Sequence, residues 1–476
     1  MKFYNRTLEL EELNRIQKLS FEENSRLTVV TGRRRIGKTS LITKALKNQI
    51  TVYLFVSRKS EGILCKNFAA TIESSLGEKI AGELNDFNSI FLYLMQLGTR
   101  KSFNLVIDEF QEFYKVNPSI YSDMQNIWDA YRKQSHVNLI VCGSIYSLMH
   151  KIFFDKEEPL FGRADNIIKL STFSIEVLKQ IMQDYSPKYH NDDLLALYAF
   201  TGGVPKYVEL FCDNHALTKD QMIEFMIRDN SPFIEEGSFL LIEEFGKNFG
   251  IYFSVLSAIS SGFNTQSQIE QLIGVSSVGG YLIKLTEDYN LIHKQRPVMA
   301  KPNSLTVRYT IEDNFLRFWF KYIDKNRSII ELKNYVGLRE IIKEDYATYS
   351  GLILEKYFIQ KLAATHKYRE IGSWWTSKSE QNEIDIVAIE LKGKKALVAE
   401  VKRQKKNFKP QLLAEKVQHL ANKTLPHYSI ETTCYTLAGR SVFFALAELL
   451  AVLALDVDRQ LEQRTGNQTD EQIDGM

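Results

Sequence analysis

Residues 27–42 read LTVVTGRRRIGKTSLI, an apolar run that leads into the pattern GxxxxGK[ST] and then into a helical run. A loop of this pattern between a strand and a helix is typical of phosphate binding. Its two glycines, Gly32 and Gly37, let the backbone fold around an anion with amide hydrogens pointing inward, and the following helix presents its positive end. A chance glycine loop is the alternative, but the flanking strand and helix argue against it. The stretch therefore predicts a P-loop nucleotide-binding fold.

Two side chains with chemical roles follow the second glycine. Lys38 supplies a mobile positive charge for the β- and γ-phosphate oxygens, and the Thr39 hydroxyl is placed to bind Mg²⁺. ATP and Mg²⁺ are therefore the expected cofactors. Contact with ATP is expected along the whole motif, at Gly32, Arg33, Arg34, Arg35, Ile36, Gly37, Lys38, Thr39 and Ser40.

A second motif, NLVIDE at residues 104–109, is an apolar strand that ends in two carboxylates. Side chains at the carboxyl end of a parallel strand face the crevice where ligands bind. We expect Asp108 to hold Mg²⁺, directly or through water, and Glu109 to polarise the water that attacks the γ-phosphate. Two acids at a strand end are by themselves commonly a solvated loop, but downstream of a phosphate loop the catalytic interpretation is preferred.

Three further residues have two interpretations each. Ser144 follows a third strand and is either a sensor of the γ-phosphate or a helix cap. Arg163, in PLFGR at 159–163, either supplies charge to the transition state as an arginine finger or is an ordinary surface arginine. Lys206, after the turn TGGVP, either reports γ-phosphate status or is a solvated loop lysine.

The composition narrows the class of protein. At 476 residues the chain is too long for one core, so roughly two to four folded units are expected. Apolar residues make up 44% and charged residues 25%, as in soluble globular proteins. Lys and Arg number 60 against 58 for Asp and Glu, so any basic surface must be local.

The expected location is the cytoplasm. The four cysteines form no CxxC pair, which argues against a zinc site or a disulfide framework and for a reducing compartment. Residues 1–16 carry charges where a secretory signal needs an apolar run. Ser441–Val457 is apolar but short for a bilayer and contains two acids. It is expected to be a buried or partner-packed helix, with a membrane span as the alternative.

Short apolar runs alternate with helical patterns from Arg26 to about Leu170, which indicates a parallel sheet joined by helices. The fold class is therefore α/β, with a P-loop ATPase core over residues 1–170. Strand signals then stop, and residues 171–240 are expected to form a helical lid. The expected strands are Leu27–Thr31, Val52–Val56, Asn104–Ile107, Val137–Cys142 and Asn166–Leu170.

Residues 246–325 combine three helical patterns with two strand-like runs, which suggests a winged helix. The third helix of such a unit commonly enters the major groove of DNA. Glu287 and Asp288 reduce the positive charge there, so reporting the nucleotide state to the C-terminal domain is an equally good interpretation. The helices are expected at Phe249–Ser260, Gln266–Ile273 and Ser276–Asp288, the strands at Leu291–Lys294 and Val307–Thr310, and exposed side chains at Tyr281, Lys284, Lys294 and Arg296.

Six stretches together resemble the archaeal-type AAA-related ATPases, a branch near the signal-transducing STAND ATPases that also occurs in bacteria. The resemblance covers about residues 1–436 and implies a winged helix after the ATPase core, followed by a domain with the restriction-endonuclease fold. The combination of PLFGR, TGGVPKYVEL and YTIEDNFLRFWFKYI is more specific to this family than the phosphate loop, which many families share. The six are GRRRIGKTSLI (32–42), LVIDEFQ (105–111), GS (143–144), PLFGR (159–163), TGGVPKYVEL (201–210) and YTIEDNFLRFWFKYI (309–323).

The last domain, residues 345–436, resembles the PD-(D/E)xK nuclease family. In a strand, Glu400 and Lys402 project to the same face, where Asp385 can join them if its strand is adjacent. The resemblance implies that Asp385 and Glu400 bind Mg²⁺, that Lys402 orients the attacking water, and that Glu355 assists. The alternative is a half-buried strand with an outward Glu and Lys. The expected elements are a helix at Gly351–Leu362, strands at Ile384–Ile389 and Ala396–Val401, and a helix after Pro410.

These patterns lead to two functional hypotheses. The first is an ATP-driven switch that repositions a winged helix and a Mg²⁺-dependent nuclease-like domain on DNA; the second is an ATP-sensing signalling protein whose inert C-terminal domain binds a protein or DNA. The expected partners are ATP and DNA, with further copies of the chain or a protein partner, and no membrane. Residues 437–476 receive no role, and their polar end is expected to be disordered. Basic residues that suit a nucleic-acid backbone, or are simply solvated, are Lys392, Lys394, Lys395, Lys402, Arg403, Lys405, Lys406 and Lys409.

Overall fold

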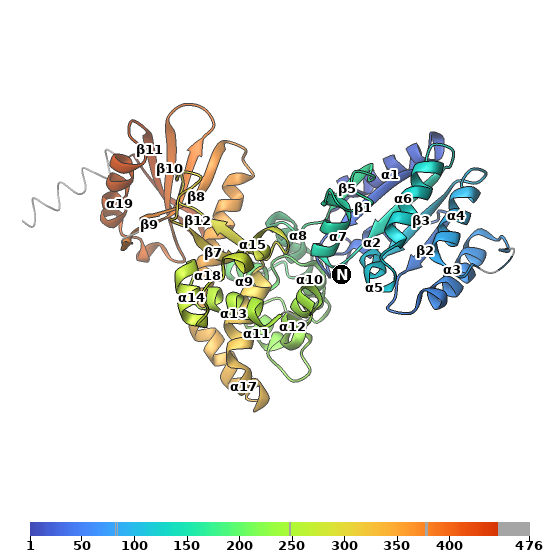
Figure 1. Ribbon diagram of the computed structural model, residues 1–476. Helices are drawn as coiled ribbons and strands as arrows, with labels where there is room; N and C mark the ends of the chain where they lie inside the picture. Colours follow the sequence, from blue (N-terminus) through green and yellow to red (C-terminus); the bar gives the residue numbers. More distant parts are fainter. Residues whose placement is uncertain (81, 83, 247–248, 377–378, 446–476) are drawn as a thin grey trace, which may run out of the picture.

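The computed structural model describes residues 1–445 except 81, 83, 247–248 and 377–378. Figure 1 shows a first α/β unit, a central group of helices, and a second sheet at the opposite end of the molecule. The α/β fold class expected from the sequence is confirmed.

The first unit is a parallel sheet of five strands in the spatial order β2-β3-β4-β1-β5. Because β4 lies between β1 and β3, the segments that follow these three strands meet at one edge of the sheet. Each strand lies within one residue of its predicted bounds. The strands are β1 (Arg26–Thr31), β2 (Thr51–Phe55), β3 (Phe103–Asp108), β4 (Val137–Cys142) and β5 (Asn166–Lys169).

Helices cover both faces of this sheet, because successive strand residues point to opposite sides. Val30 and its neighbours pack with α1 (Thr7–Glu22) and α2 (Lys38–Ala45). Val29 and its neighbours pack on the other face, where the larger apolar core lies. That core is covered by α3 (Glu61–Leu76), α4 (Phe87–Leu97), α6 (Ile120–Tyr131) and α7 (Tyr146–Phe154), with η1 (Phe110–Glu112) and α5 (Phe113–Val116) at its edge.

The central helices share one continuous apolar core, which also reaches one face of the second sheet. Three helices and a two-stranded antiparallel hairpin follow the lid in the order expected for a winged helix. The segment predicted to be a lid, residues 171–240, contains α8 (Ile175–Tyr185), α9 (Asn191–Thr201), α10 (Pro205–Asp213), α11 (Lys219–Met226) and most of α12 (Pro232–Phe245), which runs past residue 240. The following elements are α13 (Phe249–Ser260), α14 (Gln266–Ile273), α15 (Gly279–Glu287), β6 (Ile292–Gln295), β7 (Arg308–Ile311), α16 (Asn314–Phe318), η3 (Trp319–Ile323), η4 (Asp324–Asn326), α17 (Arg327–Glu331) and α18 (Tyr335–Ala363).

The C-terminal sheet has the order β12-β11-β10-β9-β8, and only its β10 and β11 pair in parallel. The sequence indicated parts of β9 and β10 and the helix α19, but not β8, β11 or β12. The predicted helix at Gly351–Leu362 is the end of the longer α18. The elements are β8 (Tyr368–Thr376), β9 (Ser379–Glu390), β10 (Lys395–Lys402), η5 (Lys405–Asn407), α19 (Pro410–Lys423), β11 (Ser429–Thr436) and β12 (Gly439–Ala445).

The apolar stretch Ser441–Val457 was expected to be a helix, and this prediction is wrong for residues 441–445. These residues continue β12, which pairs antiparallel with β11. Residues 446–457 and the polar tail lie outside the described residues. Among the helices that the structure describes, none combines the length and apolar character needed to cross a bilayer.

Gly237 on α12 provides a test of the central packing. A Cβ atom added at this residue would lie 2.2 Å from Cδ2 of Trp319, whose buried indole NH also donates to the carbonyl of Ile234. We expect Gly237→Ala to lower the free energy of unfolding by about 1–3 kcal/mol through overpacking. The urea midpoint, followed by tryptophan fluorescence, measures the change. Gly351→Ala on α18, where a Cβ meets nothing within 4 Å, is the control, and equal midpoints for the two variants would contradict the packing argument.

Candidate functional site

The loop between β1 and α2 has the backbone geometry that its glycines allow. Gly32 and Gly37 have φ values of 149° and 92°, in the region that side chains disfavour. A Cβ at Gly32 would lie 2.9 Å from the carbonyl oxygen of Leu170, so this position is closed to larger residues. Because α2 begins at Lys38, its unpaired amide groups and positive end face the loop.

The Lys38 ammonium is buried and folded back onto its own loop. Its Nζ donates to the carbonyl oxygens of Gly32, at 2.8 Å, and of Arg33, at 3.0 Å. Burial lowers the pKa of Lys38, against the opposing pull of the Glu109 and Asp108 charges. To contact a phosphate oxygen, the Lys38 ammonium must give up its hydrogen bonds to these two carbonyls.

Asp108 lies at the end of β3 and is surrounded by donors. Its Oδ2 accepts from the Tyr53 hydroxyl at 2.5 Å and lies 3.4 Å from Thr39 Oγ1. Its Oδ1 accepts from the Glu109 amide at 2.9 Å and from the Cys142 thiol at 3.0 Å. A hydroxyl and a carboxylate at this separation are the oxygen ligands that Mg²⁺ takes beside a phosphate. The residues present thus fit the expected cation.

Glu109 is held by two side chains on neighbouring segments. Its Oε2 accepts from Ser144 Oγ at 2.7 Å and from Gln111 Nε2 at 2.5 Å. Gly143 makes this approach possible, since a Cβ there would lie 2.1 Å from Gln111 Oε1. The sequence placed Ser144 beside the γ-phosphate or at a helix cap; the structure places its hydroxyl on Glu109, and α7 starts two residues later.

Sequence reasoning missed Tyr53, Gln111, Cys142 and Glu244. Cys142 is the last residue of β4, and Tyr53 is the middle residue of β2. Both reach Asp108 because β2 and β4 lie on either side of β3, a strand order that the sequence does not show. Glu244 comes from α12 and accepts from the Tyr146 amide at 2.9 Å and from Ser147 Oγ at 3.0 Å. Burial raises the pKa of Glu244. No sequence pattern connects this residue with α7.

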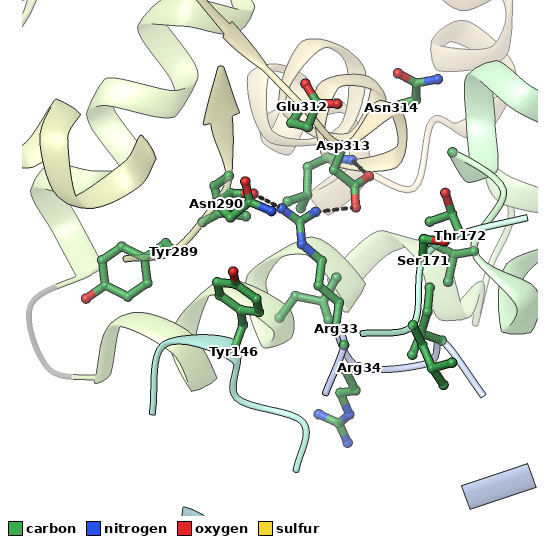
Figure 2. Close-up of a pocket in the computed structure, with 18 of the residues that line it drawn as sticks. Arg33, Arg34, Tyr146, Ser171, Thr172, Tyr289, Asn290, Glu312, Asp313 and Asn314 are labelled. Atoms are coloured by element: carbon green, nitrogen blue, oxygen red, sulfur yellow. Dashed lines mark hydrogen bonds and ion pairs between the residues drawn. The ribbon is translucent and has the colours of Figure 1, made fainter. Parts of the chain in front are cut away.

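A cavity of about 340 Å³ lies beside the loop, where the first sheet, the lid, residues 289–316 and α18 meet. Figure 2 shows Arg33 in it, pointing toward Asn290 and Asp313. The cavity is lined by Gly32, Arg33, Arg34 and Ile36 of the loop, but not by Lys38 or Thr39. The cavity is therefore distinct from the Thr39–Asp108 pair.

Two predicted residues have other partners in the structure. Arg163 donates to the carbonyl of Phe161 and forms an ion pair with Asp129 on α6 at 3.1 Å. Lys206 pairs with Glu209 on the same helix at 2.6 Å, while its amide lies 3.4 Å from the carbonyl of Arg35. Their roles toward the γ-phosphate stay predictions.

The C-terminal sheet brings Asp385, Glu400 and Lys402 together, because β9 and β10 are adjacent. Lys402 Nζ lies 3.2 Å from Asp385 Oδ2 and 2.5 Å from Glu400 Oε2. Lys416 of α19, which the sequence did not single out, holds the other oxygen of Glu400 at 2.7 Å. Asp385 also accepts from the Val401 amide at 2.7 Å.

Burial and charge shift the pKa values in this C-terminal cluster. Burial, with the charge of Glu400, raises the pKa of Asp385 to about 6. Burial, with the charge of Asp385, raises the pKa of Glu355 to about 8. Burial also opposes ionisation of Glu400, but Lys402 and Lys416 outweigh it and lower its pKa. Within the described ranges, no three His, Cys, Asp or Glu side chains are grouped to hold a metal ion.

In the segment predicted to be a winged helix, three of the four side chains expected at the surface are exposed. Lys284, Lys294 and Arg296 are exposed. Tyr281 was expected to be exposed, but it is half-buried, with its ring centroid 5.2 Å from that of Tyr252 on α13. The helical periodicity did not show that this position faces a neighbouring helix. In the C-terminal domain, Lys392, Lys394, Lys395, Lys405, Lys406 and Lys409 are exposed.

Comparison with known proteins defines the class as a P-loop ATPase. Residues 3–211 match a sequence family described as an ATPase domain predominantly from Archaea, and residues 319–415 match one described as archaeal and bacterial proteins of unknown function. An uncharacterized protein of Methanocaldococcus jannaschii is 31% identical over 418 residues, which cover 84% of this chain and 87% of that protein. The chain therefore belongs to this family of archaeal-type ATPases.

Solved structures resemble the fold. A Walker-type ATPase of Pyrococcus abyssi superposes with a TM-score of 0.51 and 19% identity, covering 67% of this chain and 96% of that one. The ORC2 protein of Aeropyrum pernix, described as ADPNP–ADP complexes, gives a TM-score of 0.46 and 13% identity, over 70% of this chain and 96% of that one. At such identities the likeness concerns the fold alone.

The Tyr53 hydroxyl tests the geometry around Asp108. We expect Tyr53→Phe to raise the Mg²⁺ concentration for half-maximal ATP hydrolysis about tenfold, because outer partners orient metal-binding carboxylates. Binding of a fluorescent ATP analogue, titrated with Mg²⁺, provides a second measurement without turnover. Tyr322→Phe removes a matched tyrosine–aspartate bond, to Asp345 at 2.6 Å, away from the loop. A similar Mg²⁺ dependence in both variants would contradict the assignment.

Proposed function

We propose that this protein is an ATP-hydrolysing switch whose nucleotide state repositions the winged-helix unit and the C-terminal domain on DNA. One observation carries the proposal: Lys38, Thr39, Asp108 and Glu109 converge at one edge of the parallel sheet. A mobile cation, a hydroxyl–carboxylate pair and a second carboxylate are the parts that phosphoryl transfer to water needs.

Each residue then has a definite task. Lys38 exchanges its two carbonyls for the β- and γ-phosphate oxygens and neutralises their charge. Thr39 and Asp108 would hold Mg²⁺, which would offset further charge on the phosphates. Glu109 takes a proton from water as the water oxygen bonds to the γ-phosphorus, and the bond to the β–γ bridging oxygen breaks to release ADP. Ser144 and Gln111 orient Glu109 through hydrogen bonds to its Oε2.

The C-terminal cluster supports a nuclease-like role on DNA. Asp385 and Glu400 lie on adjacent strands around Lys402, in the arrangement that the PD-(D/E)xK resemblance implies. Exposed lysines around β10 suit a phosphate backbone. Mg²⁺ held by the two carboxylates would activate water and stabilise the leaving oxygen.

One observation favours the signalling alternative, in which the C-terminal domain is inert and binds a protein or DNA. Both Glu400 oxygens are engaged by lysines, Lys402 and Lys416. Two ammonium groups already supply the positive charge that a cation would bring. The charge of Glu400 is therefore balanced without a metal ion, as expected for a domain that binds a partner but does not cleave DNA.

Glu109→Gln separates hydrolysis from binding. We expect the turnover of ATP to fall about a hundredfold or more, because the amide cannot accept a proton, while ATP affinity changes little. Phosphate release and calorimetric titration measure the two quantities. The control is Glu112→Gln, which alters a nearby acid paired with Arg58 and Lys115. Unchanged turnover in Glu109→Gln would remove Glu109 from the mechanism.

Plasmid cleavage tests the C-terminal site. We expect the wild type to nick supercoiled plasmid with Mg²⁺ and Asp385→Ala to fall to background, since the carboxylate would hold the cation. Glu383→Ala, which alters a nearby acid paired with Arg308, serves as the control. Equal cleavage by wild type and Asp385→Ala would remove the nuclease assignment, and DNA binding without nicking would favour the alternative.

A further inference from the structure

Three consecutive arginines of the phosphate loop are bound by acids from outside the first sheet unit. The acids belong to α12 of the lid and to the residue before α16. Carboxylates and phosphates compete for the same guanidinium groups, so these contacts link the loop to later parts of the chain. The pairs are Arg33–Asp313 at 2.8 Å, Arg34–Glu243 at 2.7 Å and Arg35–Glu236 at 2.6 Å.

The three pairs differ in burial. The Asp313 and Glu236 side chains are only 8% and 3% exposed, whereas Glu243 is 32% and its partner Arg34 44% exposed. Exposed pairs contribute little because water and salt screen them. A buried carboxylate that loses its partner is strongly disfavoured. Arg34–Glu243 is therefore a natural internal control for the other two pairs.

Arg33 joins the phosphate loop to the unit that contains the hairpin. Its guanidinium donates to Asp313 and to the carbonyl of Asn290, as Figure 2 shows. Asp313 uses its other oxygen to accept from the Leu316 amide at 3.1 Å, which caps α16. Asn290 lies two residues before β6. One side chain thus fastens both ends of the β6–β7 hairpin region to the loop.

The backbone of Arg33 has a second task. Its carbonyl oxygen is one of the two that hold the Lys38 ammonium in the folded-back position. A triphosphate that draws Lys38 away therefore removes a contact from the residue whose side chain holds Asp313. Lys38 and Asp313 therefore contact the same residue, one at its backbone and the other at its side chain.

We propose that Arg33 and Asp313 form a latch, which holds the loop with Lys38 folded back and is released when a nucleoside triphosphate binds. This proposal rests on the proposed function, because it concerns how the candidate ATP site is regulated. In the latched state, Asp313 and Asn290 fix residues 290–316 against the loop. Release frees the hairpin region to move relative to the ATPase core. By linkage, whatever opens the latch also strengthens nucleotide binding.

Asp313→Asn tests the latch in the full chain. Asparagine keeps the helix cap but removes the charge. Without the latch, we expect affinity for ATP to rise about five- to fiftyfold, within the usual range of coupling between sites. Glu243→Gln removes an equal negative charge that faces the same loop, at the exposed pair with Arg34, and we expect less than about a twofold change in ATP affinity. Calorimetric titration of ATP into each protein measures both.

Hydrogen exchange of the β6 and β7 amides gives a second measurement, because a change of charge alone would not alter the protection of these strands. ATP should lower protection of β6 and β7 in the wild type, while Asp313→Asn should show the lowered protection without nucleotide. If Asp313→Asn does not fold, Asp313→Ser also caps helices and replaces it. Equal ATP affinities in Asp313→Asn and Glu243→Gln would overturn the latch alone. Failure of the wild type to bind ATP would overturn the proposed function itself.

Discussion

The carboxyl ends of β1, β3 and β4 meet at one edge of the parallel sheet, and the candidate ATP site depends on this constraint. It arises because β4 pairs with both β1 and β3, which brings residues far apart in sequence to the same place. The phosphate loop, the Asp108–Glu109 pair and Ser144 each follow one of these strands. Neither charge nor burial could assemble the site if the strand order differed.

The buried carboxylate of Asp108 and the half-buried carboxylate of Glu244 are tolerated because each has donors. Asp108 accepts from Tyr53, Cys142 and the Glu109 amide, and Glu244 from the start of α7. Burying a carboxylate without hydrogen-bond donors would destabilise the fold, so the positions of these donors determine where the acids point. The same rule applies in the C-terminal sheet, where Lys402 and Lys416 surround Glu400.

The sequence identified those features whose signal is local. The five strands of the first sheet are continuous apolar runs, and the phosphate loop is a contiguous motif, so both could be found without the structure. Tyr53, Cys142 and Lys416 could not, because their relevance depends on which strand or helix lies next to which. Residues 441–445 were assigned to a helix as part of the longer apolar stretch Ser441–Val457, because periodicity alone does not distinguish a continuous apolar strand from a buried helix. Tyr281 was misplaced for a similar reason, as its packing depends on the orientation of α13.

The continuous apolar core of the central helices has its members at Tyr4 and from Phe173 onward, among the residues that the structure describes. The first sheet has separate cores of its own. Between them the loop arginines and Glu244 make polar contacts with α12, α7 and Asp313. If the two bodies part along these contacts, water replaces the ion pairs while the separate apolar cores stay buried. Such a rearrangement would change the heat capacity only slightly, whereas unfolding of either body would change it strongly. The reason is that the heat-capacity change scales with the apolar area that becomes exposed to water.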